Sequence, residues 1–152
     1  MNKDGPIVIV DDDTDDLDLL ANIFRELKIE NKVRLFPGGQ EALEYLNKPS
    51  VRPFLVLSDI YMPKMDGFEL RNIIRENEEL HIKCIPFLFF TTGASEEFVS
   101  RAYTLSVQGI FQKPPNYGKW KDIIEHIVTY WMYCMSPNRY KIQGIGQPSL
   151  LE

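Results

Sequence analysis

Ile7-Val8-Ile9-Val10 and the acidic residues that follow it, Asp11-Asp12-Asp13, form the most informative stretch of the sequence. A run that is apolar at every position is typical of a strand buried on both faces of a parallel sheet. Similar runs occur at residues 33–36, 54–58, 85–90 and 109–112, with apolar residues at helical spacing between them. The sequence therefore predicts an α/β fold with a doubly wound, five-stranded parallel sheet, (βα)5, in three layers.

The chain has 152 residues, 44% hydrophobic and 26% charged, with a net charge of −5. This length suits one domain, which we expect over residues 1–135, followed by a C-terminal tail at 136–152 whose last two residues are a candidate vector-derived remnant. The acidic balance argues against a nucleic-acid-binding surface. There is no signal pattern at the N-terminus, and the apolar runs are too short to cross a membrane, so we expect a cytoplasmic protein.

Polar side chains that could bind a ligand or take part in a reaction follow four of the five predicted strands. They are Asp11 and Asp12 after the first strand, Asp59 after the third, Thr91 after the fourth and Lys113 after the fifth. In a parallel sheet the carboxyl ends of the strands share one edge, and ligands bind at that edge. We therefore expect these five side chains to converge.

Three clustered carboxylates raise one another's pKa, and a hard divalent cation removes that cost. Mg²⁺ takes oxygen ligands, commonly one or two carboxylates together with phosphate oxygens. A carboxylate can also attack phosphorus and form an aspartyl phosphate, provided that the charge on the phosphoryl oxygens is stabilised. The Lys113 ammonium and the Thr91 hydroxyl are suited to that task. The residues therefore indicate Mg²⁺-dependent phosphoryl transfer.

The sequence resembles the receiver domain of two-component response regulators, in the stand-alone form of chemotaxis and phytochrome regulators, over about residues 6–134. Asp59-Ile60-Tyr61-Met62-Pro63-Lys64-Met65-Asp66-Gly67 carries most of the resemblance, with the acidic pair, Thr91-Thr92 and Lys113-Pro114. The resemblance implies a flavodoxin-like fold and a role in phosphorelay signal transduction. It implies no conventional enzyme activity beyond self-catalysed phosphotransfer and autodephosphorylation.

Residue by residue, the resemblance implies that Asp59 is the phospho-acceptor. A histidine kinase or a phosphotransfer protein is implied to supply the phosphoryl group. Thr91 and Lys113 are implied to contact the phosphoryl group, and the Lys113-Pro114 bond is often cis in this family. A downstream protein partner is implied to read the phosphorylated state. Asp12, Asp59 and the backbone carbonyl of Tyr61 are implied to bind Mg²⁺ directly, and Asp11 is implied to assist in metal binding through water.

The sequence departs from the family pattern at Ile110, where a tyrosine or phenylalanine usually acts as a rotameric switch. Either Phe111 or Tyr103 serves instead, or Ile110 simply packs, which we favour. Tyr61 and Gly93 occupy positions that tune attack of water on the acyl phosphate, and a bulky Tyr61 predicts a long-lived phosphorylated state. The predicted modulating positions are Tyr61, Thr92, Gly93 and Ile110.

Other protein classes fit these residues less well. A haloacid-dehalogenase type of phosphohydrolase fails, because Asp15 stands where its signature needs Thr or Val. An EF-hand fails, because Asp16 replaces the required Gly and Asn22 the required Glu. A pseudo-receiver that binds without taking phosphate remains the rival, although every site residue is present. We interpret Asp13, Asp15 and Asp16 as a solvated start of the first helix rather than as ligands.

The last predicted helix carries more aromatic residues than one buried stripe needs, including Tyr130 and Tyr133, and Tyr140 follows it. Aromatic residues are enriched at the centres of interfaces. The family commonly pairs through its fourth helix, fifth strand and fifth helix. We therefore expect a homodimer that uses this face and the tail.

Overall fold

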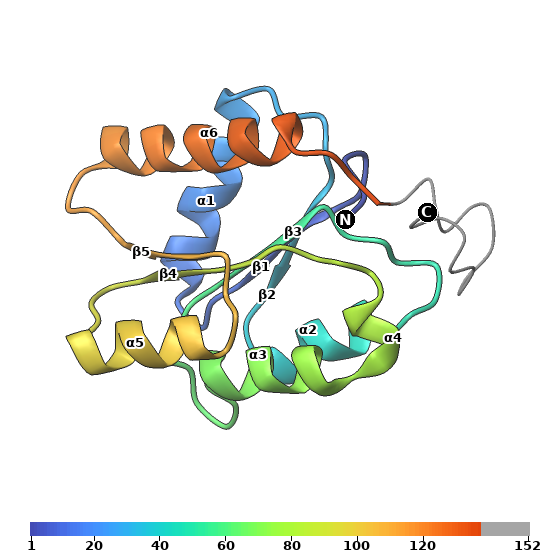
Figure 1. Cartoon of the computed structure of the whole chain (residues 1–152). Coiled ribbons are helices and arrows are strands. Elements are labelled where there is room, and N and C mark those ends of the chain that lie inside the picture. Colours follow the sequence, from blue (N-terminus) through green and yellow to red (C-terminus); the bar gives the residue numbers. More distant parts are fainter. Residues whose placement is uncertain (138–152) are drawn as a thin grey trace.

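The computed structural model describes residues 1–137. Its strands form an all-parallel sheet in the order β2-β1-β3-β4-β5, so the chain reverses direction across the sheet after β2 (Figure 1). Such a reversal creates a crevice at the carboxyl edge. The strands are β1 (Ile7–Val10), β2 (Val33–Phe36), β3 (Leu55–Ser58), β4 (Phe87–Thr91) and β5 (Gly109–Gln112).

Helices cover both faces of the sheet, which confirms the predicted three-layer, flavodoxin-like architecture. In Figure 1, α1 and α6 lie above the sheet, and the other helices lie below it. None of the described helices is long and apolar enough to span a bilayer. The helices are α1 (Thr14–Glu26), α2 (Gly39–Leu46), α3 (Gly67–Glu76), α4 (Glu78–His81), α5 (Glu96–Thr104) and α6 (Tyr117–Tyr133).

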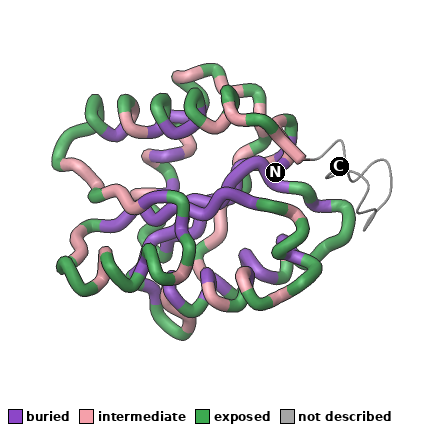
Figure 2. The backbone as a smooth tube through the Cα atoms, in the orientation of Figure 1, coloured by how far each residue is buried: buried purple, intermediate pink, exposed green. Residues whose placement is uncertain are grey.

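The sheet separates two apolar layers, and its central strands are buried from end to end (Figure 2). Alternate residues of β1 serve the two layers: Val8 and Val10 pack toward α2 and α3, whereas Ile7 and Ile9 pack toward α1 and α6. This double burial explains why the strand is apolar at every position. It also fixes the strand register, because a slip of one residue would exchange the two layers.

Side-chain caps start most of the helices. The Asp13 carboxylate accepts from the backbone N–H groups of Asp15 and Asp16 at 2.9 and 3.3 Å, and Ser95 accepts from Phe98 at 3.2 Å. Each cap satisfies N–H groups that have no partner within the first turn.

The short helix α4 was not predicted from the sequence. Asn77 has an extended backbone, with φ −83° and ψ 115°, so α3 ends at Glu76. The Asn77 side chain then accepts from the N–H of Leu80 at 3.1 Å and starts a new helix. Asparagine favours caps over helix interiors because its side chain competes for backbone groups. As a result, the family's fourth and fifth helices correspond here to α5 and α6.

Candidate functional site

The backbone ladder continues past three strands and carries the site residues to one edge of the sheet. The N–H of Asp11 donates to Phe36 at 3.0 Å, and the N–H of Asp59 donates to Val10 at 2.9 Å. The N–H of Lys113 donates to the carbonyl of Thr91 at 2.7 Å. The convergence predicted from the sequence is therefore present, and it is held by main-chain hydrogen bonds.

Three carboxylates meet at this edge. Asp11, Asp12 and Asp59 each place an oxygen within 4.8 Å of the others. Asp11 and Asp59 are buried, with 2% and 6% of their surface exposed, whereas Asp12 is exposed. An all-oxygen set of this kind fits a hard divalent cation such as Mg²⁺.

Asp59 is held by its neighbours on both sides. Its Oδ1 accepts from the backbone N–H of Ile60 at 2.7 Å, and its Oδ2 lies 3.2 Å from Lys113 Nζ. The Ser58 hydroxyl donates to the backbone carbonyl of Asp59 at 2.8 Å. One oxygen of the carboxylate is therefore hydrogen-bonded to the main chain, and the other is hydrogen-bonded to the lysine.

Lys113 reaches more carboxylates than the sequence predicted. Its ammonium lies 2.6 Å from Asp11 Oδ2, 2.7 Å from Asp16 Oδ2 and 3.2 Å from Asp59 Oδ2. Burial lowers the pKa of Lys113, but the hydrogen bonds to Asp11 and Asp16 outweigh it, so the pKa is raised overall. The lysine stays charged at any physiological pH.

Asp16 corrects the interpretation of the acidic helix start. Asp13 does cap α1, and Asp15 is exposed, as expected of solvated residues. Asp16 instead contacts Lys113, although the two residues are 97 positions apart. Sequence spacing gave no signal for this pair, because it depends on how α1 is oriented against β5.

Burial raises the pKa of Asp11 from 3.8 to about 6, even though the hydrogen bonds from Lys113 and from the Asp13 N–H act to lower it. The charge of Asp59 adds to the rise. Desolvation disfavours the charged carboxylate because the interior solvates it less well than water does. A bound cation would offset this cost, which is a second reason why the cluster suits a metal.

Thr91 has an unsatisfied polar atom at the carboxyl end of β4. The residue is 1% exposed, and its Oγ1 has no hydrogen-bond partner among the described residues. A buried hydroxyl without a partner costs free energy, so such groups are uncommon unless a ligand completes them. Thr91 lies at the end of β4, between β3 and β5, where an anion near Asp59 could accept a hydrogen bond from its hydroxyl.

The predicted modulating residues differ in their surroundings. Tyr61 is 49% exposed, and its ring lies 5.7 Å from that of Phe98 on α5. Thr92 is exposed, and a side chain at Gly93 would meet no atom within 4 Å. Ile110 is partly buried against the apolar layer below the sheet.

The alternative switch residues lie apart from one another. Phe111 packs against the layer that contains α1 and α6, and Tyr103 is 54% exposed on α5. The peptide bond before Pro114 is trans, since the described residues contain no cis peptide. The cis bond implied by the resemblance is therefore not found, and Lys113 reaches the acidic cluster without it.

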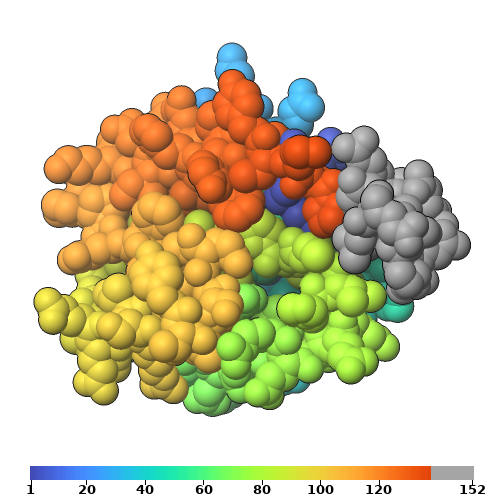
Figure 3. All heavy atoms as spheres, in the orientation of Figure 1, coloured from blue at the N-terminus to red at the C-terminus, as the bar shows by residue number. Residues whose placement is uncertain are grey.

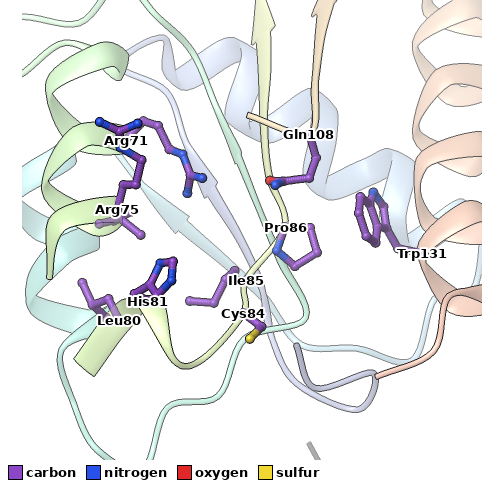
Figure 4. A pocket seen from close by; sticks show the side chains of 10 residues that line it. Arg71, Arg75, Leu80, His81, Cys84, Ile85, Pro86, Gln108 and Trp131 are labelled. Atoms are coloured by element: carbon purple, nitrogen blue, oxygen red, sulfur yellow. The ribbon is translucent and has the colours of Figure 1, made fainter. Parts of the chain in front are cut away.

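A separate pocket of about 250 Å³ lies at the opposite, amino-terminal edge of β4 and β5 (Figure 4). Arg71 lines it and is 8% exposed. Its guanidinium donates to the carbonyls of Leu105 and Ser106 at 2.9 and 2.8 Å, at the end of α5. None of the acidic site residues lines this pocket.

The match to protein-family models covers residues 7–125 and identifies a response regulator receiver domain. The chain belongs to the response regulator receiver family. Receivers act in two-component signalling, where they interact with histidine kinases and downstream partners, and they bind Mg²⁺ or Mn²⁺ at an acidic pocket. In this receiver the acidic pocket corresponds to the cluster of Asp11, Asp12 and Asp59.

Individual relatives agree with the family match. The receiver is 30% identical over 130 residues to the probable methanogenesis regulatory protein FilR2 of Methanothrix harundinacea, covering 83% of each chain. It superposes on the phosphorylated cyanobacterial phytochrome response regulator RcpA with a TM-score of 0.78 and 26% identity, over 87% of this chain and 96% of that one.

A third relative is a metal-bound receiver. The Mn²⁺-bound form of Rcp1 superposes with a TM-score of 0.75 and 27% identity, over 87% of this chain and 97% of that one. Rcp1 of Synechocystis is 28% identical over 136 residues, which is 86% of this chain and 91% of Rcp1. These relatives match the receiver over most of their own length.

Proposed function

We propose that Asp59 accepts a phosphoryl group from the phosphohistidine of a histidine kinase or a phosphotransfer protein. One observation carries this proposal. The buried Asp59 carboxylate lies beside the buried Lys113 ammonium, and the neighbouring strand ends in Thr91, whose hydroxyl has no partner among the described residues. A phosphoryl group on Asp59 would supply the acceptors that both donors can use. Asp11 also contacts Lys113, at 2.6 Å, but it follows β1, whereas Asp59 follows β3, which pairs directly with the strand that ends at Thr91.

In the proposed step, a carboxylate oxygen of Asp59 attacks phosphorus. The P–N bond to the donor imidazole breaks, its electron pair returns to the ring nitrogen, and an acyl phosphate remains on Asp59. Lys113 and the Thr91 hydroxyl then hold the phosphoryl oxygens through charge-assisted hydrogen bonds. Positioning and charge stabilisation carry most of such a transfer.

Asp11, Asp12, Asp59 and the backbone carbonyl of Tyr61 would hold Mg²⁺ in this proposal. The ion supplies neutralising charge for the phosphoryl oxygens and the crowded carboxylates when it is bound. Asp12 is exposed and open to solvent, which suits a cation that keeps several waters. Asp11 is the more deeply buried acid and supports the cluster from within.

The proposed output is a change in protein association, without a conventional enzyme activity. Figure 3 shows a face on which residues of α6, in orange and red, lie above those of α5, in yellow and orange. Beside it, a cavity of about 520 Å³ is lined by Phe111, Tyr130 and Trp131 among others. Tyr103 and Tyr130 are more than half exposed. Exposed aromatic residues around a hollow suit a partner or a second receiver.

The homodimer is a separate part of the proposal. The part of the proposed interface that the structure describes lies on α5, β5 and α6. Tyr140, which was also expected to take part, lies outside the described residues. Light scattering with and without a phosphoryl mimic tests it: a shift toward the dimer with the mimic supports pairing through this face. A monomer under both conditions would refute it and leave a downstream protein as the partner.

Incubation with a small phosphodonor and Mg²⁺ tests the central proposal, with Asp59→Asn as the variant. Intact mass should rise by one phosphoryl group in the wild-type protein and stay constant in the variant. Asp15→Asn is the matched control, because Asp15 is an exposed acid close to the site. Equal labelling of wild type and Asp59→Asn would refute the proposal.

A further inference from the structure

The Lys113 ammonium has three N–H groups, and the structure directs them to three carboxylates. The contacts are unequal: Asp11 and Asp16 lie at 2.6 and 2.7 Å, whereas Asp59 lies at 3.2 Å. The lysine side chain is 5% exposed and that of Asp16 is 22% exposed, so this pair is largely removed from water. A pair in such surroundings interacts more strongly than one on an open surface.

Asp16 is fixed in place by the start of α1. Its backbone N–H donates to the Asp13 carboxylate at 3.3 Å, and the N–H of Asp15 donates to the same oxygen at 2.9 Å. The cap therefore anchors the first turn from which the Asp16 side chain reaches Lys113. Asp15 belongs to the same turn but is exposed, and it makes no contact with Lys113.

Asp16 stands outside the group of oxygens that can share a metal ion. That group, among the described residues, consists of Asp11, Asp12 and Asp59. The Asp16 carboxylate is therefore directed at the lysine alone. The ammonium lies closer to Asp16, at 2.7 Å, than to Asp59, at 3.2 Å.

We propose that Asp16 is a positioning residue that holds Lys113 back from Asp59, so that the acceptor carboxylate stays available for phosphorylation. This inference rests on the proposed function. Asp59 Oδ1 already accepts from the Ile60 N–H at 2.7 Å, so Oδ2 is the less occupied oxygen. Without Asp16, the ammonium would be shared by Asp11 and Asp59 only and would move onto Oδ2. A carboxylate paired on both oxygens is a weaker nucleophile.

Asp16→Asn tests the inference, since asparagine keeps the size of the side chain and removes its charge. The rate constant of phosphorylation at saturating phosphodonor and Mg²⁺ should fall roughly three- to tenfold, which is the size of effect expected for one hydrogen-bonded contact. The phosphodonor concentration for half-maximal rate should stay unchanged, because Asp16 does not contact the donor. Asp16→Glu should restore part of the rate.

Asp15→Asn is the matched control, because it removes the same charge from the same helical turn without touching Lys113. Its rate should equal that of the wild type. A double-mutant cycle with Lys113→Met separates positioning from a general structural effect. Asp16→Asn should slow phosphorylation when Lys113 is present, and it should have no effect when it is combined with Lys113→Met.

A measurement on the unphosphorylated protein supports the same test. The ammonium resonance of Lys113, observed by ¹⁵N NMR, should be protected from exchange in the wild type and in Asp15→Asn, and it should be lost or shifted in Asp16→Asn. Equal rates in Asp16→Asn and Asp15→Asn, with normal wild-type labelling, would overturn this inference alone. An effect of equal size with and without Lys113 would also overturn it. No labelling of the wild-type protein would overturn the proposed function and this inference with it.

Discussion

Gly67 packs directly against the backbone of Asp59. A Cβ added at Gly67 would lie 2.3 Å from the carbonyl oxygen of Asp59 and 2.9 Å from the Cα of Ile60. The Gly67 N–H donates to the Ile60 carbonyl at 2.8 Å, so the start of α3 is tied to the segment that carries the proposed acceptor. The glycine of the Asp-Gly pair therefore serves close backbone approach.

Gly67→Ala should destabilise the protein, because the obstructing atoms belong to the main chain and cannot rotate away. We expect a loss of about 1–3 kcal/mol in the free energy of unfolding, as for other overpacked core positions. Gly93→Ala is the control, since nothing lies within 4 Å of its added Cβ. It should change stability by less than about 1 kcal/mol. Urea unfolding of both variants measures the difference, and similar losses would contradict the packing account.

Thr91→Val should weaken the response to a phosphoryl group without weakening the unphosphorylated protein. Valine keeps the shape and removes a buried hydroxyl that has no partner among the described residues. The unphosphorylated protein should therefore be unchanged or more stable by up to about 1 kcal/mol. The stabilisation produced by beryllium fluoride, a phosphoryl mimic, should fall by about 1–2 kcal/mol because one hydrogen bond is lost.

Thr92→Val is the control for that experiment, since Thr92 is the exposed neighbour. It should leave both the basal stability and the response to beryllium fluoride close to wild type. Thermal unfolding with and without the mimic measures both quantities. An unchanged response in Thr91→Val would show that the hydroxyl does not serve the phosphoryl group.

The stability of the metal-free protein should depend on pH through Asp11. Its pKa is 3.8 in the unfolded reference and about 6 in the fold, so the folded state retains a proton that the unfolded chain has released between these values. The free energy of unfolding contributed by this group should fall by about 1–3 kcal/mol as pH rises through that window. Asp11→Asn should lack this fall.

The difference in stability between Asp11→Asn and wild type should thus grow in favour of the variant from pH 4 to pH 7. Urea unfolding in the presence of a chelator measures it. A difference that stays constant over that range would show that burial does not disfavour the charged form of Asp11.

Tyr61→Ala should shorten the lifetime of the phosphorylated protein. Tyr61 lies two residues after Asp59, and its ring packs against Phe98. We expect this ring to shield the acyl phosphate, so its removal should open the phosphate to water. We expect hydrolysis to accelerate by roughly three- to tenfold, equivalent to about 1 kcal/mol in the barrier. Tyr103→Ala, which removes another exposed tyrosine, is the control. Phosphate release after removal of the donor measures the rates, and equal lifetimes would refute shielding.

The sequence was most informative where burial leaves little choice. Residues 33–36 and 109–112 were predicted as strands and are strands β2 and β5. The site was also predictable, because each apolar run defines where its strand ends and a parallel sheet brings those ends together. The fourth strand was predicted from Ile85 but begins at Phe87. Proline at position 86 has no N–H for the ladder, and the Phe87 N–H donates to the Gln108 side chain.

Contacts set by helix orientation were not predictable in the same way. Asp16 was assigned to a solvated helix start because acidic residues commonly occupy the first turn. Its contact with Lys113 depends on the angle of α1 above the sheet, which hydrophobic spacing does not encode. The break at Asn77 was missed for a related reason, since the same residue type can end one helix or cap the next.

Chemical mapping of the phosphorylated residue tests the central claim most directly. Borohydride reduces an aspartyl phosphate to homoserine, which peptide mass spectrometry locates in the sequence. After treatment with a phosphodonor and Mg²⁺, homoserine should appear at position 59 and nowhere else. Homoserine at Asp11, Asp12 or Asp66, or none at any position, would contradict the assignment of Asp59 as the phospho-acceptor.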